Sequence, residues 1–152
     1  MSALERLLDP ACTRCELPGG GQKAIFEEVA GMVAAAHPGL DPGDVIGKLL
    51  AREKLGSTGL GGGIAIPHCR IPACEEPVGA LVTLLRPADF DAPDDQPVDL
   101  LFVLLVPEEA HQEHLDMLAS IARLFSQESL CQALRACQTD RDLYATALDW
   151  QG

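Results

Sequence analysis

Positive charge is scarce in this sequence. Lysine and arginine number 11 against 23 aspartates and glutamates, which gives a formal net charge of -12. The field of such a chain repels the phosphate backbone of nucleic acids and the anionic headgroups of lipids. We therefore expect no nucleic-acid partner and no binding to membrane surfaces.

The sequence also lacks a long uninterrupted apolar run. Its longest apolar stretch, Val98 to Val106, contains Asp99 and has roughly half of the ~20 residues that a membrane helix needs. We interpret it as a buried strand and expect no membrane insertion. The N-terminus lacks the basic start and apolar run of a signal peptide. We therefore expect a cytoplasmic protein, in which the six cysteines stay mostly as free thiols.

Clusters of metal-ligating residues are missing as well. Cys12 and Cys15 form a CxxC pair, but no second pair with the spacing of zinc ligands follows. His111 and His114 are three residues apart and would share a helix face, yet the sequence offers them no evident third ligand. We therefore expect neither a bound metal nor a cofactor, and we interpret the two cysteines as buried or idle.

The residues that are present suffice for one compact domain covering residues 1–152. With 47% hydrophobic residues, a chain of this length can bury a sizeable core. Helical and extended patterns are mixed along the chain, which favours an α/β fold: one mixed β-sheet flanked by helices on both faces.

Each predicted element has its own signal. Apolar spacing predicts helices over 22–37, from Pro42 to Leu55 and through the segment after Pro107, whose first turn would contain Glu108 and Glu109. Runs of β-branched and aliphatic residues predict central strands over 78–85 and 98–106. Asp41 marks the start of the helix from Pro42 to Leu55. Two further helices are predicted to start at Ser126 and at Thr139 or Asp140.

The segment GSTGLGGGIAIPHCRIP, between Gly56 and Pro72, carries the candidate chemistry. Its glycines allow the backbone to approach an anion closely, and those we assign to a phosphate-binding loop are Gly59, Gly61, Gly62 and Gly63. No Gly-Lys-Ser/Thr follows, so it is not a Walker A loop. A helix precedes the segment and Ile64 fills the third glycine position, so it is not a Rossmann fingerprint either.

His68 follows this glycine-rich stretch directly after Pro67. A partly neutral imidazole can attack a phosphoryl group through one ring nitrogen and form a labile phosphoamidate. Composition alone favours a surface or core histidine without chemistry. Arg52, at the end of the preceding helix, is by the same reasoning either an electrostatic clamp or a solvated helix-end cation.

The string REKLGSTGLGGGIAIPH, Arg52 to His68, resembles the phosphorylation-site signature of the enzyme IIA proteins of the bacterial phosphotransferase system, in the mannitol, fructose and nitrogen-regulatory class. The resemblance continues through QPVDLLFVLLVPEEAHQEHLDMLASIARLF and RACQTDRDLYATAL, and so covers essentially the whole chain. The GSTG loop, in a chain without attached membrane or B domains, is most similar to the nitrogen-regulatory branch.

This resemblance implies a role for each site residue. His68 would accept a phosphoryl group from a phosphohistidine on an HPr-like carrier, Arg52 would clamp it, and His114 would hydrogen-bond it or orient His68. Regulated targets such as potassium-transport or sensor-kinase proteins are implied as further partners. The alternative is a sugar-specific enzyme IIA that passes the phosphate to a B domain. Cys69 stands where the family usually has glycine, and a positive φ there would strain a cysteine.

Overall fold

The computed structural model describes residues 3–109 and 112–150, and His111 lies outside the described residues. The elements, in chain order, are α1 (Ala3–Leu7), β1 (Leu8–Leu17), α2 (Gln22–Ala36), α3 (Pro42–Leu55), β2 (Gly59–Gly61), β3 (Ile64–Ala65), β4 (His68–Arg70), β5 (Val78–Ala88), β6 (Val98–Val106), α4 (Gln112–Phe125), α5 (Glu128–Arg135) and α6 (Asp140–Asp149).

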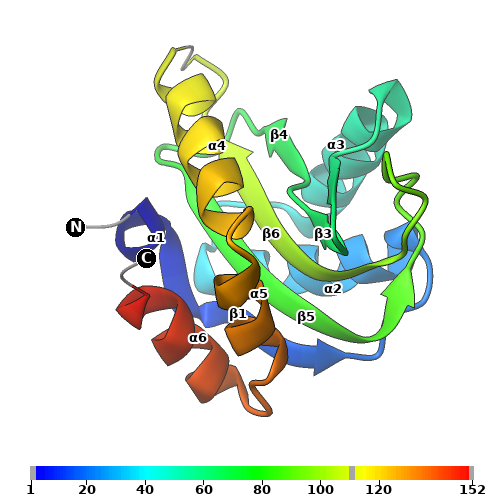
Figure 1. The fold of residues 1–152 in the computed structure, drawn as a ribbon. Helices are drawn as coiled ribbons and strands as arrows, with labels where there is room; N and C mark the ends of the chain where they lie inside the picture. Colours follow the sequence, from blue (N-terminus) through cyan, green and yellow to red (C-terminus); the bar gives the residue numbers. More distant parts are fainter. Residues whose placement is uncertain (1–2, 110–111, 151–152) are drawn as a thin grey trace.

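The strands form a six-stranded mixed sheet (Figure 1), in which five strands follow the order β1-β5-β6-β3-β2 and the sixth, β4, also pairs with β6. β5 and β6 are antiparallel, whereas β1 runs parallel to β5. β3 and then β4 pair in parallel with successive parts of β6, at Leu100–Leu101 and at Leu104–Val106. The predicted α/β class is therefore confirmed, and both predicted strands are central in the sheet.

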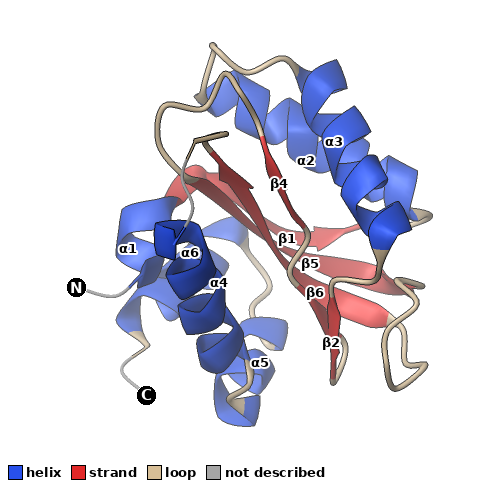
Figure 2. Cartoon of the chain, turned by 90° about the horizontal axis from the view of Figure 1, so that it is seen from above, coloured by secondary structure: helices blue, strands red, loops and turns tan. Residues whose placement is uncertain are grey.

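Helices cover both faces of the sheet (Figure 2). α2 and α3 pack on one face over a core that includes Phe26, Val29 and Leu105. α1, α4, α5 and α6 pack on the other over a core that includes Phe102, Leu104 and Phe125. β6 contributes buried residues to both cores, which explains why its sequence is a continuous apolar run rather than an alternating one.

Two helix starts agree with the sequence signals. The side chain of Asp41 accepts a hydrogen bond from the backbone N–H of Asp44 at the start of α3, at 2.9 Å. The hydroxyl of Thr139 likewise accepts from the backbone N–H of Asp142 at the start of α6. Such caps satisfy N–H groups that have no partner within the helix, and so fix where the helix begins.

Other predicted boundaries were wrong. α4 begins at Gln112, so Glu108 and Glu109 lie in the turn that precedes it rather than in its first turn. Ser126 does not start α5, because its hydroxyl donates to the carbonyl of Arg123 at the end of α4. The N-cap of α5 is Gln127. β5 continues three residues past the predicted Leu85, to Ala88.

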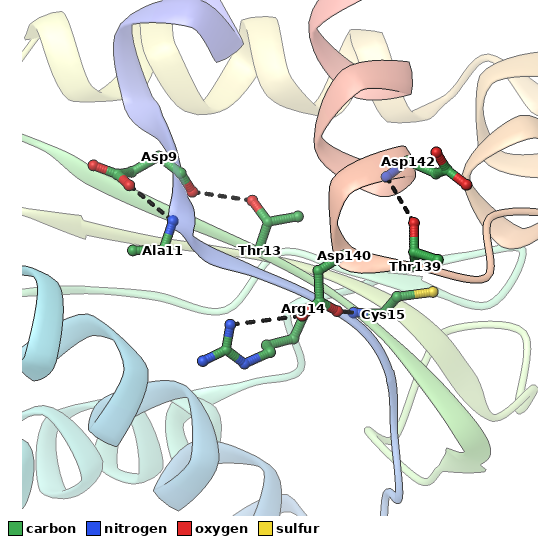
Figure 3. A network of polar contacts seen from close by, with 8 residues as sticks. All are labelled: Asp9, Ala11, Thr13, Arg14, Cys15, Thr139, Asp140 and Asp142. Carbon is green, nitrogen blue, oxygen red and sulfur yellow. Dashed lines mark hydrogen bonds and ion pairs between the residues drawn. The ribbon is translucent and has the colours of Figure 1, made fainter.

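The N-terminal strand β1 is tied to α6 by polar contacts (Figure 3). The backbone N–H of Cys15 donates to the carboxylate of Asp140 at 2.7 Å, and Arg14 pairs with the same carboxylate at 3.7 Å. Cys12 packs in the core under α2, whereas Cys15 packs against the opposite core. The two thiols of the CxxC pair therefore face opposite sides of the sheet, and all six cysteines are free.

Two further features of the structure bear on membrane and metal binding. Among the described residues, no helix combines the length and the apolar character needed to cross a membrane. The same part of the chain contains no group of three or more His, Cys, Asp or Glu side chains placed to hold a metal ion.

Candidate functional site

A cavity of about 560 Å³ lies over β4 and the end of β6. β4 lies between α3 and α4, which stand on either side of it in both views (Figures 1 and 2). The residues that line the cavity are Lys48, Ala51, Arg52, Leu55, His68, Cys69, Arg70, Leu104, Val106, His114, Leu115 and Leu118. Three of the predicted site residues, Arg52, His68 and His114, thus meet at one cavity although they come from three different elements.

His68 is the first residue of β4 and pairs in register with Leu104 of β6. Because side chains alternate across a strand, His68 and Arg70 share the face of Leu104 and Val106, and Cys69 shares the opposite face with Leu105. This register directs the imidazole to the sheet face that α4 covers, and α4 carries His114. His68 is half-buried, so its ring is held and still reachable.

One ring nitrogen of His68 already has a partner. Nδ1 lies 2.8 Å from the carbonyl oxygen of Ile66. A carbonyl only accepts, so in the neutral ring Nδ1 carries the proton and donates it to Ile66. The lone pair of the neutral imidazole is then on Nε2, which is the nitrogen available as a nucleophile.

The surroundings of His68 favour the neutral ring. The pKa of His68 is lowered from its ordinary value, mainly by burial and further by the positive charge of Arg52. The hydrogen bond to Ile66 and the negative charge of Glu53 act in the opposite direction but are outweighed. The imidazole is therefore predominantly neutral, and nucleophilic, at pH 7.

Arg52 lies in the last turn of α3, and its Nη1 donates to the carbonyl of Gly56 at 2.9 Å. This bond holds the guanidinium at the helix end beside the cavity. Lys48 and Arg70 line the same cavity, and no carboxylate is found among the described residues that line it. In a chain with a formal net charge of -12, this concentration of cations marks a place for an anion.

His114 lies in the first turn of α4 and is only 6% exposed. It lines the cavity together with His68. A buried imidazole at this position can donate to an oxygen of a bound group or accept from a neighbouring donor, according to its tautomer. The placement agrees with the role that the resemblance implies for it.

The predicted glycine loop is divided between two places. Gly59 lines a smaller cavity of about 240 Å³, which adjoins the first because Arg52 and His68 border both. Gly61 and Gly62 line a separate cavity that includes Arg135 but not His68. The N–H of Gly62 donates to the carboxylate of Asp94 at 2.9 Å.

Gly63 forms the turn that leads into β3. Its carbonyl accepts from the backbone N–H groups of Asp99 and Leu100, and its φ is +81°. A Cβ at this position would lie 2.7 Å from the guanidinium of Arg135. The hydrogen bonds of Gly62 and Gly63 therefore form the glycine hairpin, the turn between β2 and β3. Of the four predicted glycines, only Gly59 borders the His68 site.

Cys69 is accommodated without backbone strain. The non-glycine residues with positive φ in the described part of the chain are Glu16, Asp91 and Asp95, so Cys69 has an ordinary strand conformation. Its side chain is buried in the core shared with Leu105. Burial raises the pKa of the thiol to about 12, so it is protonated and unreactive at neutral pH.

Sequence reasoning missed two cations of the site, and a signal for each was present. Lys48 is four residues before Arg52 on α3, which places both on one helix face. Arg70 is two residues after His68, which places both on one strand face. Counting four residues back from Arg52 along the helix and two residues on from His68 along the strand would have identified both cations.

Comparison with known proteins finds one matching family and several similar chains. Residues 6–149 match the model of the family described as phosphoenolpyruvate-dependent sugar phosphotransferase system, EIIA 2. The chain is 46% identical over 151 residues to the nitrogen regulatory protein of Pseudomonas aeruginosa, covering 99% of this chain and 98% of that protein. It is 41% identical over 150 residues to the nitrogen regulatory protein of Escherichia coli, covering 98% and 91% respectively.

Solved structures share the fold. The nitrogen regulatory protein IIA-Ntr of Neisseria meningitidis aligns with a TM-score of 0.86 and 39% sequence identity, over 95% of this chain and 99% of that chain. The IIA mannitol structure of Escherichia coli aligns with a TM-score of 0.71 over 91% and 97% of the two chains. The latter pair is only 18% identical, so that likeness concerns the fold alone.

Proposed function

The chain belongs to the EIIA 2 family of the phosphoenolpyruvate-dependent sugar phosphotransferase system, and from this premise we propose that it is a nitrogen-regulatory phosphocarrier with His68 as its phosphoryl acceptor. The observation that carries the proposal is the meeting of His68, Arg52 and His114 at one cavity, which the described residues line without any carboxylate.

The proposed reaction is phosphoryl transfer between two imidazoles. Nε2 of His68 attacks the phosphorus of a phosphohistidine on an HPr-like carrier. The nitrogen–phosphorus bond of the donor breaks as the new bond forms, and the donor nitrogen leaves with the bonding electron pair. Throughout, the hydrogen bond from Nδ1 to Ile66, 2.8 Å long in the free protein, keeps the ring oriented.

The charge that spreads over the phosphoryl oxygens is met by the cations of the cavity. The guanidinium of Arg52, held by the carbonyl of Gly56, is the clamp, and Lys48 and Arg70 supply further positive charge. Preorganised charges of this kind stabilise the transition state because they need no reorganisation during the reaction. His114 donates to a phosphoryl oxygen or orients His68.

Apolar side chains at the rim suit a protein donor. Leu55 and Leu115, which line the cavity, are 86% and 61% exposed. Leu60, at the adjoining cavity, is 45% exposed. Large apolar residues exposed around a reactive group are typical of a protein–protein contact. We infer that this rim receives the HPr-like carrier.

The output of the phosphocarrier is regulatory. A phosphoryl group adds roughly -1.5 to -2 charges at pH 7, and here it would offset much of the positive charge that Lys48, Arg52 and Arg70 bring to the cavity. Target proteins such as potassium-transport or sensor-kinase systems would then distinguish the two states. The assignment of residues 1–152 to one such domain, and the cytoplasmic location, stay predictions.

Incubation with a phosphorylated HPr-like carrier tests the function. We expect intact-mass spectrometry to show one added phosphoryl group per chain, labile in acid and stable in base as a phosphoramidate is. A phosphorylated chain that then transfers the group rapidly to an isolated sugar-specific B domain would favour the sugar-transport alternative. A chain that never becomes labelled would contradict both.

A further inference from the structure

We propose that Glu53 and Thr58 are positioning residues for His68, and that they act through a chain of hydrogen bonds ending at its Nδ1. The inference rests on the function proposed above, because it concerns the same acceptor ring. Neither Glu53 nor Thr58 lines the larger cavity that His68 shares with Arg52 and His114.

The chain of hydrogen bonds can be followed from the end of α3 to β4. The carboxylate of Glu53 accepts from both the hydroxyl and the backbone N–H of Thr58. The carbonyl of Thr58 accepts from the backbone N–H of Ile66 at 3.1 Å. The carbonyl of the same Ile66 accepts from Nδ1 of His68 at 2.8 Å. Each bond thus shares a residue with the next.

Thr58 and Ile66, which lie between Glu53 and His68 in this chain of hydrogen bonds, are held in place. Thr58 is 6% exposed and Ile66 is 4% exposed, so neither moves freely into solvent. The ring of Pro67 restricts its own backbone, and its carbonyl accepts from the backbone N–H of Leu104 of β6, so the residue between Ile66 and His68 is also held. The segment from Gly56 to Gly63 is rich in glycine, so its conformation depends on such side-chain anchors more than on intrinsic stiffness.

Glu53 also contributes through its charge. Its carboxylate raises the pKa of His68, against the lowering effects of burial and of Arg52. Among the described residues, the other titratable or charged groups that line the cavity are Lys48, Cys69, Arg70 and His114. Glu53 therefore keeps the ring more basic, and Nε2 more nucleophilic, than burial beside Arg52 alone would allow.

The first test needs no carrier. Nitrogen-15 NMR of the histidine side chains reports which nitrogen of His68 is protonated, and its titration gives the pKa. We expect the parent and Thr58→Ser to show the Nδ1–H tautomer. Thr58→Val, which removes the hydroxyl but keeps the shape, should show a mixture of tautomers. Glu53→Gln should lower the pKa of His68, because the opposing negative charge is gone.

The matched control is Asp94→Asn. Asp94 also accepts a backbone N–H of the glycine hairpin, that of Gly62, but it is not part of the chain to His68. We expect this variant to keep the parent tautomer and pKa. The transfer rate from a phosphorylated HPr-like carrier should fall by roughly tenfold to a hundredfold in Thr58→Val, with KM for the carrier near that of the parent.

The outcomes separate the two proposals. Folded Thr58→Val and Glu53→Gln proteins with the parent tautomer, pKa and rate would overturn the positioning role. If Thr58→Val does not fold, Glu53→Gln and its pKa decide alone. A parent protein that shows the expected NMR behaviour but is never phosphorylated would instead overturn the proposed function, and leave the hydrogen-bond chain standing.

Discussion

The Nδ1 nitrogen of His68 lies 2.8 Å from the carbonyl oxygen of Ile66, two residues earlier in the chain. The contact is favoured because the ring of Pro67 restricts the backbone between the two residues, and because β4 fixes the backbone of His68 against β6. A local backbone acceptor thereby selects the tautomer of the ring. The nucleophile is thus defined before any partner binds.

Arg52→Ala should slow phosphoryl transfer by about 10² or more, which is the scale for loss of one preorganised charge-stabilising group. Lysine at this position should rescue only part of the rate, since it lacks the planar fork of the guanidinium. Single-turnover kinetics with a phosphorylated carrier measure the effect. Lys54→Ala is the control, because Lys54 is an exposed cation of the same helical turn that does not line the cavity. Equal transfer rates for both alanine variants would contradict a role for Arg52 in phosphoryl transfer and show that it is only a helix-end cation.

His114→Ala should still be labelled on His68, but with slower transfer or faster loss of the phosphoryl group. The reason is that His114 borders the cavity without being the point of attachment. His37→Ala is the control, since His37 borders a different cavity. Labelling and decay are followed by intact mass, and circular dichroism checks the fold. Parent-like transfer and decay in folded His114→Ala would refute the role.

The acceptor activity should persist at pH values below the ordinary histidine pKa of about 6.5. The pKa of His68 is lowered, chiefly by burial, so the ring stays neutral until the pH falls further than usual. Transfer should therefore decline only as the pH drops through this lowered pKa. The initial rate as a function of pH, with a carrier whose own phosphorylation is constant over the range, measures the midpoint. A midpoint at or above 6.5 would contradict the assignment.

Gly63→Ala should lower the free energy of unfolding by about 1–3 kcal/mol, the usual cost of a side chain at a sparsely populated backbone conformation. The φ of Gly63 is +81°, and a Cβ would lie 2.7 Å from the guanidinium of Arg135 and 3.1 Å from the carboxylate of Asp99. Gly47→Ala, in the exposed interior of α3 with nothing within 4 Å of its Cβ, should instead stabilise by up to about 1 kcal/mol. Urea unfolding compares the two variants, and equal shifts would contradict the hairpin geometry.

The parts of the fold that the sequence revealed are those with a strong local signal. β6 was predicted with its observed bounds, since it is apolar on both faces, and the start of α3 was marked by Asp41. β1 was missed because Pro10 interrupts it and its burial pattern does not alternate. Proline is tolerated there because β1 is an edge strand that pairs with β5 alone.

The site was predictable only in part, for a similar reason. His68 and Arg52 stand in a short recognisable string, and their meeting with His114 was expected. The division of the glycines was not, because it depends on Asp94, Asp99 and Arg135, which lie more than 30 residues further along the chain. The hydrogen-bond chain from Glu53 to His68 could not be predicted either, because it runs through backbone groups, and the identity of a residue does not show which partner its backbone will bond.

The most direct test of the central claim is intact-mass spectrometry of the parent and of His68→Ala after incubation with a phosphorylated HPr-like carrier. Two-bond couplings from nitrogen-15 NMR of the labelled parent then locate the phosphoryl group on the ring. We expect one phosphoryl group on Nε2 of His68 in the parent and none on the His68→Ala protein. Full labelling of folded His68→Ala would contradict it.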